Sequence, residues 1–307
     1  MPLYASVYVS PPIPLLGPNG KPGGLWSPIS STLLHTTTDA VLIDTPITIA
    51  QNNDLIAWIR ATLHLGCKLT YVYITHGHGD HWFGINALLQ AFPGVQVLAT
   101  KGTIAHMRDQ VSASTFQTAW GSRFPSQIDT NFSVIDKVQP LSSDGEFHIP
   151  NETGGKHTMC AVETGHTDTH DTTVLFCPDL ALVAAGDAVY GDVHQMLAEA
   201  NTPALRGEWI SAIEKIQALE PTPRIVVPGH MKADEVPGAW HLERSKRYIQ
   251  DFDDLVRGGE FGGSVKGLVG KMKERWPTRF NDAVVVLSSM VAVRQLKEAG
   301  GGKGGKL

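Results

Sequence analysis

The chain has 307 residues, long enough for one large domain or two small ones, and 42% of them are hydrophobic. That content is ordinary for a globular protein with a substantial core, and it excludes a chain that is mainly disordered. The 25 basic and 30 acidic residues leave a net charge of −5 with no basic stripe, which argues against a nucleic-acid binder.

The cysteines and the N-terminal prolines indicate where in the cell the protein is expected to be found. Cys67, Cys160 and Cys177 are odd in number and form no CxxC pair, so we expect a reducing compartment and a cytoplasmic protein. Prolines between Pro2 and Pro18 interrupt every apolar run at the start of the chain. We therefore expect neither a signal peptide nor a membrane span.

Apolar periodicity predicts strands that alternate with helices. The expected strands, in chain order, lie within 31–45 (two, with a turn at Thr38–Asp39) and at 69–75, 95–100, 159–164, 173–177, 180–185 and 224–227. The expected helices are one capped by Asn53 or Asp54, one at 83–92, one around 209–219, and two near the end at 240–257 and 281–298. This alternation predicts an α/β layered core.

Two segments fall outside the alternation. Residues 102–152 lose steady periodicity, and we interpret them as an insertion that either covers a functional site or is a surface excursion without a role. The glycine-rich residues 300–307 are expected to form a flexible tail.

The strand predicted at 69–75 leads into a run of four metal-capable side chains. That run is His76-Gly77-His78-Gly79-Asp80-His81. In extended backbone, residues i and i+2 point the same way, so His76 and His78 can share one ion. The two glycines let the loop turn sharply and aim Asp80 and His81 at a second point nearby. Imidazole and carboxylate together suit Zn²⁺, with manganese, iron and cobalt as alternatives.

Three further candidate ligands each follow a predicted strand and a glycine. They are His166, Asp187 and His230. A glycine directly before each one permits a tight turn that presents the side chain at the edge of a sheet. The repetition is hard to explain by packing alone.

This set of residues resembles the metallo-β-lactamase superfamily over roughly residues 30 to 230. The resemblance implies a single domain over residues 1–307 with a four-layer αββα sandwich and a two-metal site along one edge of the sheets. It implies that the first metal is held by His76, His78 and His166, the second by Asp80, His81 and His230, and that Asp187 bridges both. Asp44 matches an early aspartate that supports the ligands without binding metal itself.

The resemblance also narrows the chemistry. A bridging aspartate such as Asp187 is typical of glyoxalase II-like thioesterases and lactonases, and it is absent from the antibiotic-degrading β-lactamases. The spacings of 21 residues from His166 to Asp187 and 43 from Asp187 to His230 resemble those of acyl-homoserine lactone lactonases. The 85 residues between His81 and His166 exceed what those lactonases need. Members with such insertions include the benzoxazolinone-opening lactamases, to which the chain is similar.

The expected activity is hydrolysis of a small cyclic amide or ester, a lactam or lactone, by a hydroxide bound between two Zn²⁺ ions per chain. Asp80 or Asp187 would carry the proton to the leaving group, and Tyr190 would donate a hydrogen bond to the substrate. His194 is a candidate for lining the substrate pocket, and His170 for supporting a ligand.

Two alternatives stay open at this point, a glyoxalase II-like hydrolase of glutathione thioesters and a metal-binding scaffold without activity. The expected partner is a small-molecule substrate rather than nucleic acid or membrane, with a homodimer left open.

Overall fold

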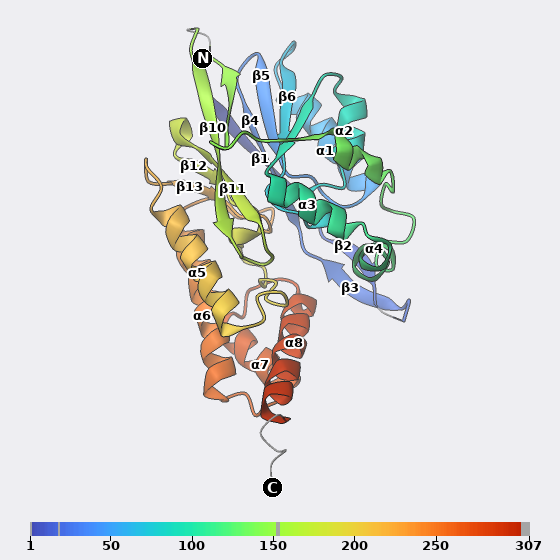
Figure 1. Ribbon diagram of the computed structural model, residues 1–307, viewed down its shortest axis with the longest axis vertical. Helices are drawn as coiled ribbons and strands as arrows, with labels where there is room; N and C mark the ends of the chain where they lie inside the picture. The colour runs from blue at the N-terminus through green and yellow to red at the C-terminus, as the bar shows by residue number, and fades with distance from the viewer. Residues whose placement is uncertain (1, 18, 152–153, 302–307) are drawn as a thin grey trace.

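Two β-sheets lie face to face at the centre of the molecule (Figure 1). The computed structural model describes residues 2–17, 19–151 and 154–301. The first sheet has the strand order β1 (Tyr4–Ser10), β4 (Ile29–His35), β5 (Asp39–Ile43), β6 (Lys68–Tyr73), β7 (Gln96–Ala99) and β8 (Val138–Pro140). The second has the order β13 (Ile225–Val227), β12 (Leu182–Ala184), β11 (Thr172–Cys177), β10 (Lys156–Gly165) and β9 (Glu146–Pro150). A buried apolar layer that includes Val41, Tyr73, Met159 and Leu175 fills the space between them.

Helices cover the outer face of each sheet. On the first sheet lie α1 (Ile49–Thr62), α2 (Ile85–Ala91) and α3 (Lys101–Gln110). On the second lie α5 (Pro203–Gln217) and α6 (Trp240–Gly258), while α7 (Val265–Arg275) packs against α6 and α8 (Asp282–Gly301) packs against α7 beyond the end of the sheets. Each helical layer buries its own apolar cluster against the sheet. The predicted α/β class and four-layer αββα sandwich are therefore confirmed.

Shorter elements complete the chain. They are the hairpin β2 (Ile13–Leu16) and β3 (Pro22–Trp26), the short helix α4 (Ala113–Phe116), a π-helical turn η2 (Gln117–Gly121), and the 3₁₀ turns η1 (Gly79–His81), η3 (Phe132–Lys137), η4 (Pro178–Leu180) and η5 (Gly186–Ala188). None of the helices in the described residues is long and apolar enough to cross a membrane.

Helix α1 begins earlier than predicted. Its N-cap is Thr48, whose hydroxyl accepts the amide of Gln51 at 3.2 Å while the Gln51 side chain accepts the amide of Thr48 at 3.2 Å. The prediction of Asn53 or Asp54 as the cap is wrong, because this reciprocal capping box satisfies the first amides of the helix one turn before the apolar pattern becomes regular.

The described part of residues 102–152 contains more regular secondary structure than its sequence pattern predicts. They include most of α3 and the strands β8 and β9, which are edge strands of the two sheets. Only the stretch between α3 and η3 stands apart from the layers (Figure 1). The interpretation of 102–152 as an insertion stays a prediction. Of the predicted tail, Gly300 and Gly301 belong to α8, and residues 302–307 lie outside the described residues.

The topology gathers several strand ends along one edge of the sandwich. Asp44 follows β5, and the histidine-rich run follows β6, which pairs with β5 in parallel. Asp187 follows β12 and His230 follows β13, another parallel pair. Strands that run in parallel end at the same edge, so residues far apart in sequence come together there.

Candidate metal centre

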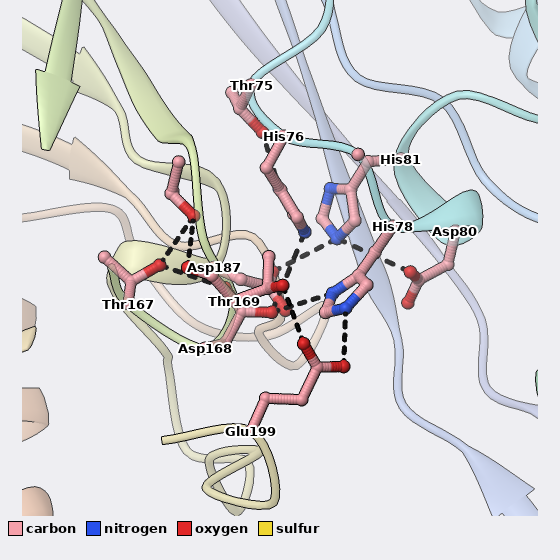
Figure 2. A network of polar contacts seen from close by, with 12 residues as sticks. Thr75, His76, His78, Asp80, His81, Thr167, Asp168, Thr169, Asp187 and Glu199 are labelled. Carbon is pink, nitrogen blue, oxygen red and sulfur yellow. Dashed lines mark hydrogen bonds and ion pairs between the residues drawn. The ribbon is translucent and has the colours of Figure 1, made fainter. Parts of the chain in front are cut away.

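The loop after β6 brings the first cluster of possible ligands together. His76 and His81 are fully buried, with their ring centroids 4.2 Å apart, and His78 is the only partly exposed histidine of the loop. The backbone amide of His81 donates to the carbonyl of His78 at 3.0 Å, which closes the short turn η1. The turn thus aims the side chains of one short segment into a common space, as Figure 2 shows.

The first group of ligand atoms consists of His76, His78 and Asp168, whose ligand atoms all lie within 4.8 Å of one another. Asp168 Oδ2 is 2.8 Å from His78 Nδ1 and 3.8 Å from His76 Nε2 (Figure 2). The other carboxylate oxygen of Asp168 accepts a hydrogen bond from the Thr167 hydroxyl at 3.0 Å, so the carboxylate is held with one oxygen toward the two imidazoles.

The second group consists of Asp80, His81 and His230, which also lie within 4.8 Å of one another. Asp187 joins this group from β12, because its Oδ1 is 3.1 Å from His81 Nε2 and its Oδ2 is 3.2 Å from His230 Nε2. Burial alone would lower the pKa of His230, but the charges and hydrogen bonds of Asp187 and Asp80 together outweigh burial and raise this pKa to about 10. The same negative charges would attract a divalent cation.

A cation fits the buried polar atoms of both groups. His76 Nε2, His81 Nε2, Asp168 Oδ2 and Asp187 Oδ1 are buried and make no hydrogen bond with the described residues. Buried polar atoms without hydrogen bonds are costly, and several that face one another across about 3 Å need a shared partner. Imidazole nitrogens and carboxylate oxygens in this number are the donor set of a divalent metal such as zinc, so the residues present fit the ion.

Neighbouring residues hold the ligands in place. Asp44 Oδ2 lies 2.9 Å from His81 Nδ1, and the same carboxylate accepts the amide and hydroxyl of Thr75 at 2.9 and 2.7 Å. The indole of Trp26 donates to Asp80 Oδ2 at 2.9 Å, and His230 Nδ1 lies 2.7 Å from the carbonyl oxygen of Pro28. Contacts of this kind fix the ring orientation and tautomer of a metal ligand.

Steric constraints explain why glycine precedes two of the candidate ligands, at Gly186 before Asp187 and at Gly229 before His230. Gly186 has φ +47°, a conformation that a side chain would strain. A Cβ on Gly229 would lie 2.2 Å from Asp187 Oδ1, so only glycine lets the β13 turn approach this carboxylate. Both glycines therefore serve the placement of Asp187 and His230.

His166 is not a member of the first group of ligand atoms, where the resemblance implied it as the third ligand, and that role stays a prediction. In the described residues the third member is Asp168, and the Nε2 atom of His166 is buried without a hydrogen-bond partner. The chain leaves β10 at Gly165 with φ +85° and turns back into β11 at Thr172, and this turn points Asp168 at the imidazoles.

The contacts of His170 are with a neighbouring carboxylate and a second histidine ring. Its Nδ1 atom is 2.8 Å from the exposed carboxylate of Asp171, and its ring lies tilted against that of His106 with the centroids 4.2 Å apart. The ring of His106 in turn packs against His78 at 5.4 Å. His170 thus reaches the ligands through His106 rather than directly.

Tyr190 and His194 both border the cavity described below. The Tyr190 hydroxyl donates to Asp187 Oδ2 at 2.5 Å, and burial together with the charge of Asp187 raises the pKa of Tyr190, so the phenol stays protonated. His194 Nδ1 lies 2.8 Å from the hydroxyl of Tyr248, and burial lowers the pKa of His194 to about 4. His194 is therefore neutral near pH 7.

Three residues of the site were not predicted from the sequence. They are Trp26, Asp168 and Glu199, the last of which contacts His78 Nε2 at 3.2 Å and accepts the Thr169 hydroxyl at 2.7 Å (Figure 2). The sequence did offer a signal for Asp168. It is a metal-capable residue two positions after His166 and two before His170, in the segment that follows Gly165. Trp26 and Glu199 come from distant segments, and no local pattern marks them.

A cavity of about 590 Å³ opens from the two groups of ligands. Its floor is formed by His78, Asp80, Asp168, Asp187 and His230. The hairpin β2–β3, the segment from Thr115 to Arg123, and α8 form its walls. Pockets that bind small molecules have volumes of about 300–1,000 Å³, so this cavity is large enough for a small-molecule substrate.

Comparison with known proteins agrees with this architecture. A family model described as the metallo-beta-lactamase superfamily matches residues 24–230. The chain is 24% identical over 225 residues to a type 2 metallo-beta-lactamase from Bacteroides fragilis, which covers 73% of this chain and 76% of that protein. The solved metallo-beta-lactamase from Pontibacter korlensis has a TM-score of 0.55 at 20% identity, over 81% of this chain and 100% of the other. The metallo-beta-lactamase FIM-1 from Pseudomonas aeruginosa, in its mono-zinc form, has a TM-score of 0.54 at 15% identity, over 81% and 91%.

The fold and the metal-capable edge thus define a hydrolase of the αββα class. Because the family model spans more than half of the chain, the protein belongs to the metallo-β-lactamase superfamily.

Proposed function

We propose that the protein is a binuclear metal-dependent hydrolase that opens a small cyclic amide or ester, a lactam or a lactone. The observation that carries this proposal is the pair of ligand groups, His76/His78/Asp168 and Asp80/His81/His230, on the floor of one cavity. The superfamily supplies the reaction class, and the cavity supplies room for the substrate beside the ligands.

Each group would hold one divalent cation. Asp187 would contribute its carboxylate to the second group, and the resemblance implies that it also reaches the first. Zinc is the first choice because imidazole and carboxylate ligands suit it, and the Pseudomonas aeruginosa relative is itself a mono-zinc form. Manganese, iron and cobalt accept the same ligands. When bound, such cations supply Lewis acidity that lowers the pKa of water and polarises a carbonyl group.

The protein's own residues prepare this chemistry. Asp44 orients His81, and Trp26 holds Asp80 by one carboxylate oxygen. Tyr190 donates to Asp187 and so fixes this carboxylate beside His81 and His230. Positioned donors of this kind act without reorganisation during the reaction.

A leaving amide nitrogen needs a proton, and two carboxylates border the cavity where that transfer would occur. Asp80 Oδ1 is the freer oxygen, because Oδ2 accepts the Trp26 indole and faces His230 at 3.5 Å. We assign the proton transfer to Asp80 Oδ1, with Asp187 as the alternative, since two buried imidazoles and Tyr190 already engage Asp187. A lactam depends on this step more than a lactone does.

The test is a hydrolysis screen of the zinc-loaded protein against lactones, lactams and S-lactoylglutathione, run beside the Asp187→Ala variant. The proposal predicts turnover of a lactone or lactam by the wild type and loss of that turnover in the variant. Hydrolysis confined to S-lactoylglutathione would instead identify a thioesterase. No turnover in any of the three classes would refute the proposal.

A further inference from the structure

The cavity beside the ligands is lined unevenly. Its floor is charged, whereas the walls facing the floor are largely apolar. The apolar wall residues include Leu15, Leu25, Trp120, Val284, Leu287 and Met290. Apolar walls favour burial of an apolar part of a ligand, and polar groups at one end fix its orientation.

The walls offer a carboxylate one cation, and that cation is already hydrogen-bonded to the backbone. Among the described residues that line the cavity, Arg123 is the one with a permanent positive charge. Nη1 of its guanidinium donates to the backbone carbonyl oxygens of Thr118, at 3.3 Å, and Ala119, so its own helical turn holds the group in place. Glu199 adds a negative charge to the rim beside His78. Burying an anionic group of a ligand against these walls is therefore unfavourable.

Helix α8 closes the side of the cavity opposite the ligand loops. Its N-terminal end is anchored by Asn281, whose side-chain amide donates to the Ser27 hydroxyl at the end of the hairpin β2–β3 at 2.8 Å. The family model ends at residue 230, so this wall lies outside the part of the chain that the superfamily defines. Val286 and Met290 on α8 are exposed apolar side chains that border the cavity.

We infer that the substrate is an uncharged ester or amide whose remote part is an aliphatic or aromatic group, bound between the hairpin β2–β3 and α8. This inference rests on the proposed function and adds the class of substrate. The reacting carbonyl lies at the charged floor, and the apolar remainder lies against the walls. A remote carboxylate at the same place would lie against apolar side chains and near Glu199, with Arg123 as the one cation among the described lining residues.

Three γ-lactones of graded structure test this inference on the zinc-loaded protein. They are γ-butyrolactone, which has no tail, γ-decalactone, which has an uncharged hexyl tail, and the matching lactone whose tail ends in a carboxylate. We expect kcat/KM to be at least tenfold higher for γ-decalactone than for each of the other two. Unproductive binding of the carboxylate to the floor does not alter kcat/KM. The ratio of kcat/KM values between two lactones therefore reports how their tails interact with the walls.

A matched pair of variants locates the effect on α8. Val286 borders the cavity and is 36% exposed, whereas Leu296 lies on the same helix away from it and is 42% exposed. Val286→Asp is expected to raise KM for γ-decalactone at least tenfold, and Leu296→Asp is expected to leave the kinetics of both lactones unchanged.

The outcomes separate this inference from the proposed function. Hydrolysis of γ-butyrolactone with no preference for γ-decalactone, or equal effects of the two variants, would overturn the apolar substrate class and leave the hydrolase intact. Absence of hydrolysis of all three lactones would remove the proposed lactonase activity and this inference with it.

Discussion

Asp44 gives the sharpest test of how the ligands are held. Its carboxylate meets three donors at once, His81 Nδ1 at 2.9 Å and the amide and hydroxyl of Thr75 at 2.9 and 2.7 Å. It is 2% exposed and has φ +60°, a conformation that asparagine tolerates. Asp44→Asn therefore keeps the shape and the backbone and replaces one accepting oxygen with a donating amide.

The expected loss follows from that one mismatch. Whichever way the new amide turns, either His81 or Thr75 faces a donor instead of an acceptor. Loss of such a supporting partner lowers metal affinity about 10- to 100-fold, which corresponds to about 1.4–2.8 kcal/mol. We expect this decrease for zinc in a competition titration against a chromophoric chelator.

Asp39→Asn is the matched control, because Asp39 lies at the other end of β5 and accepts the Thr70 hydroxyl at 2.7 Å, away from the ligands. It should leave zinc affinity unchanged. Equal zinc affinity of the Asp44→Asn and Asp39→Asn proteins would refute the idea that Asp44 supports His81 as a ligand.

Three further variants test separate parts of the account. Asp168→Ala should lower the zinc content by about one ion per chain, measured by elemental analysis, while Asp171→Ala, its exposed neighbour, should not; an unchanged content in Asp168→Ala would exclude Asp168 as a ligand. Tyr190→Phe removes a hydrogen bond to a charged carboxylate, so kcat should fall about 10- to 100-fold at unchanged zinc content, and normal kcat would make Tyr190 a packing residue only. Thr48→Ala removes the capping box of α1 and should reduce the free energy of unfolding by about 1 kcal/mol in urea titration, whereas an unchanged midpoint would contradict the capping role.

The layered fold was predictable because apolar periodicity survives in most of its elements. The strands around Val72, Leu175 and Val226 and the helix with Trp209 and Ile213 lie where the pattern indicated. These residues face an apolar layer, and burial imposes the spacing that the sequence displays.

The elements that were not predicted lack that constraint. Strand β1 and the hairpin β2–β3 are only partly buried, and both strands of the hairpin contain a proline, so these strands show no clean alternation. Helix α7 buries only Leu268 and Met272, too few to mark a face. The short strands β8 and β9 are edge strands, where pairing on one side suffices.

The candidate site was predictable where ligands follow strands and glycines. His76, His78, Asp80, His81 and His230 all contribute to the groups of ligand atoms, because strand ends at a shared edge must meet. The membership of Asp168 in the first group was not predictable in this way. It depends on how the turn after Gly165 directs its side chains, and sequence spacing does not encode that direction.

The central claim, that these side chains hold two cations, is tested most directly by the zinc content of the purified protein. Elemental analysis after zinc loading and exhaustive dialysis should find two ions per chain in the wild type and fewer in Asp187→Ala. A wild type that retains no zinc, manganese, iron or cobalt after the same treatment would contradict the account.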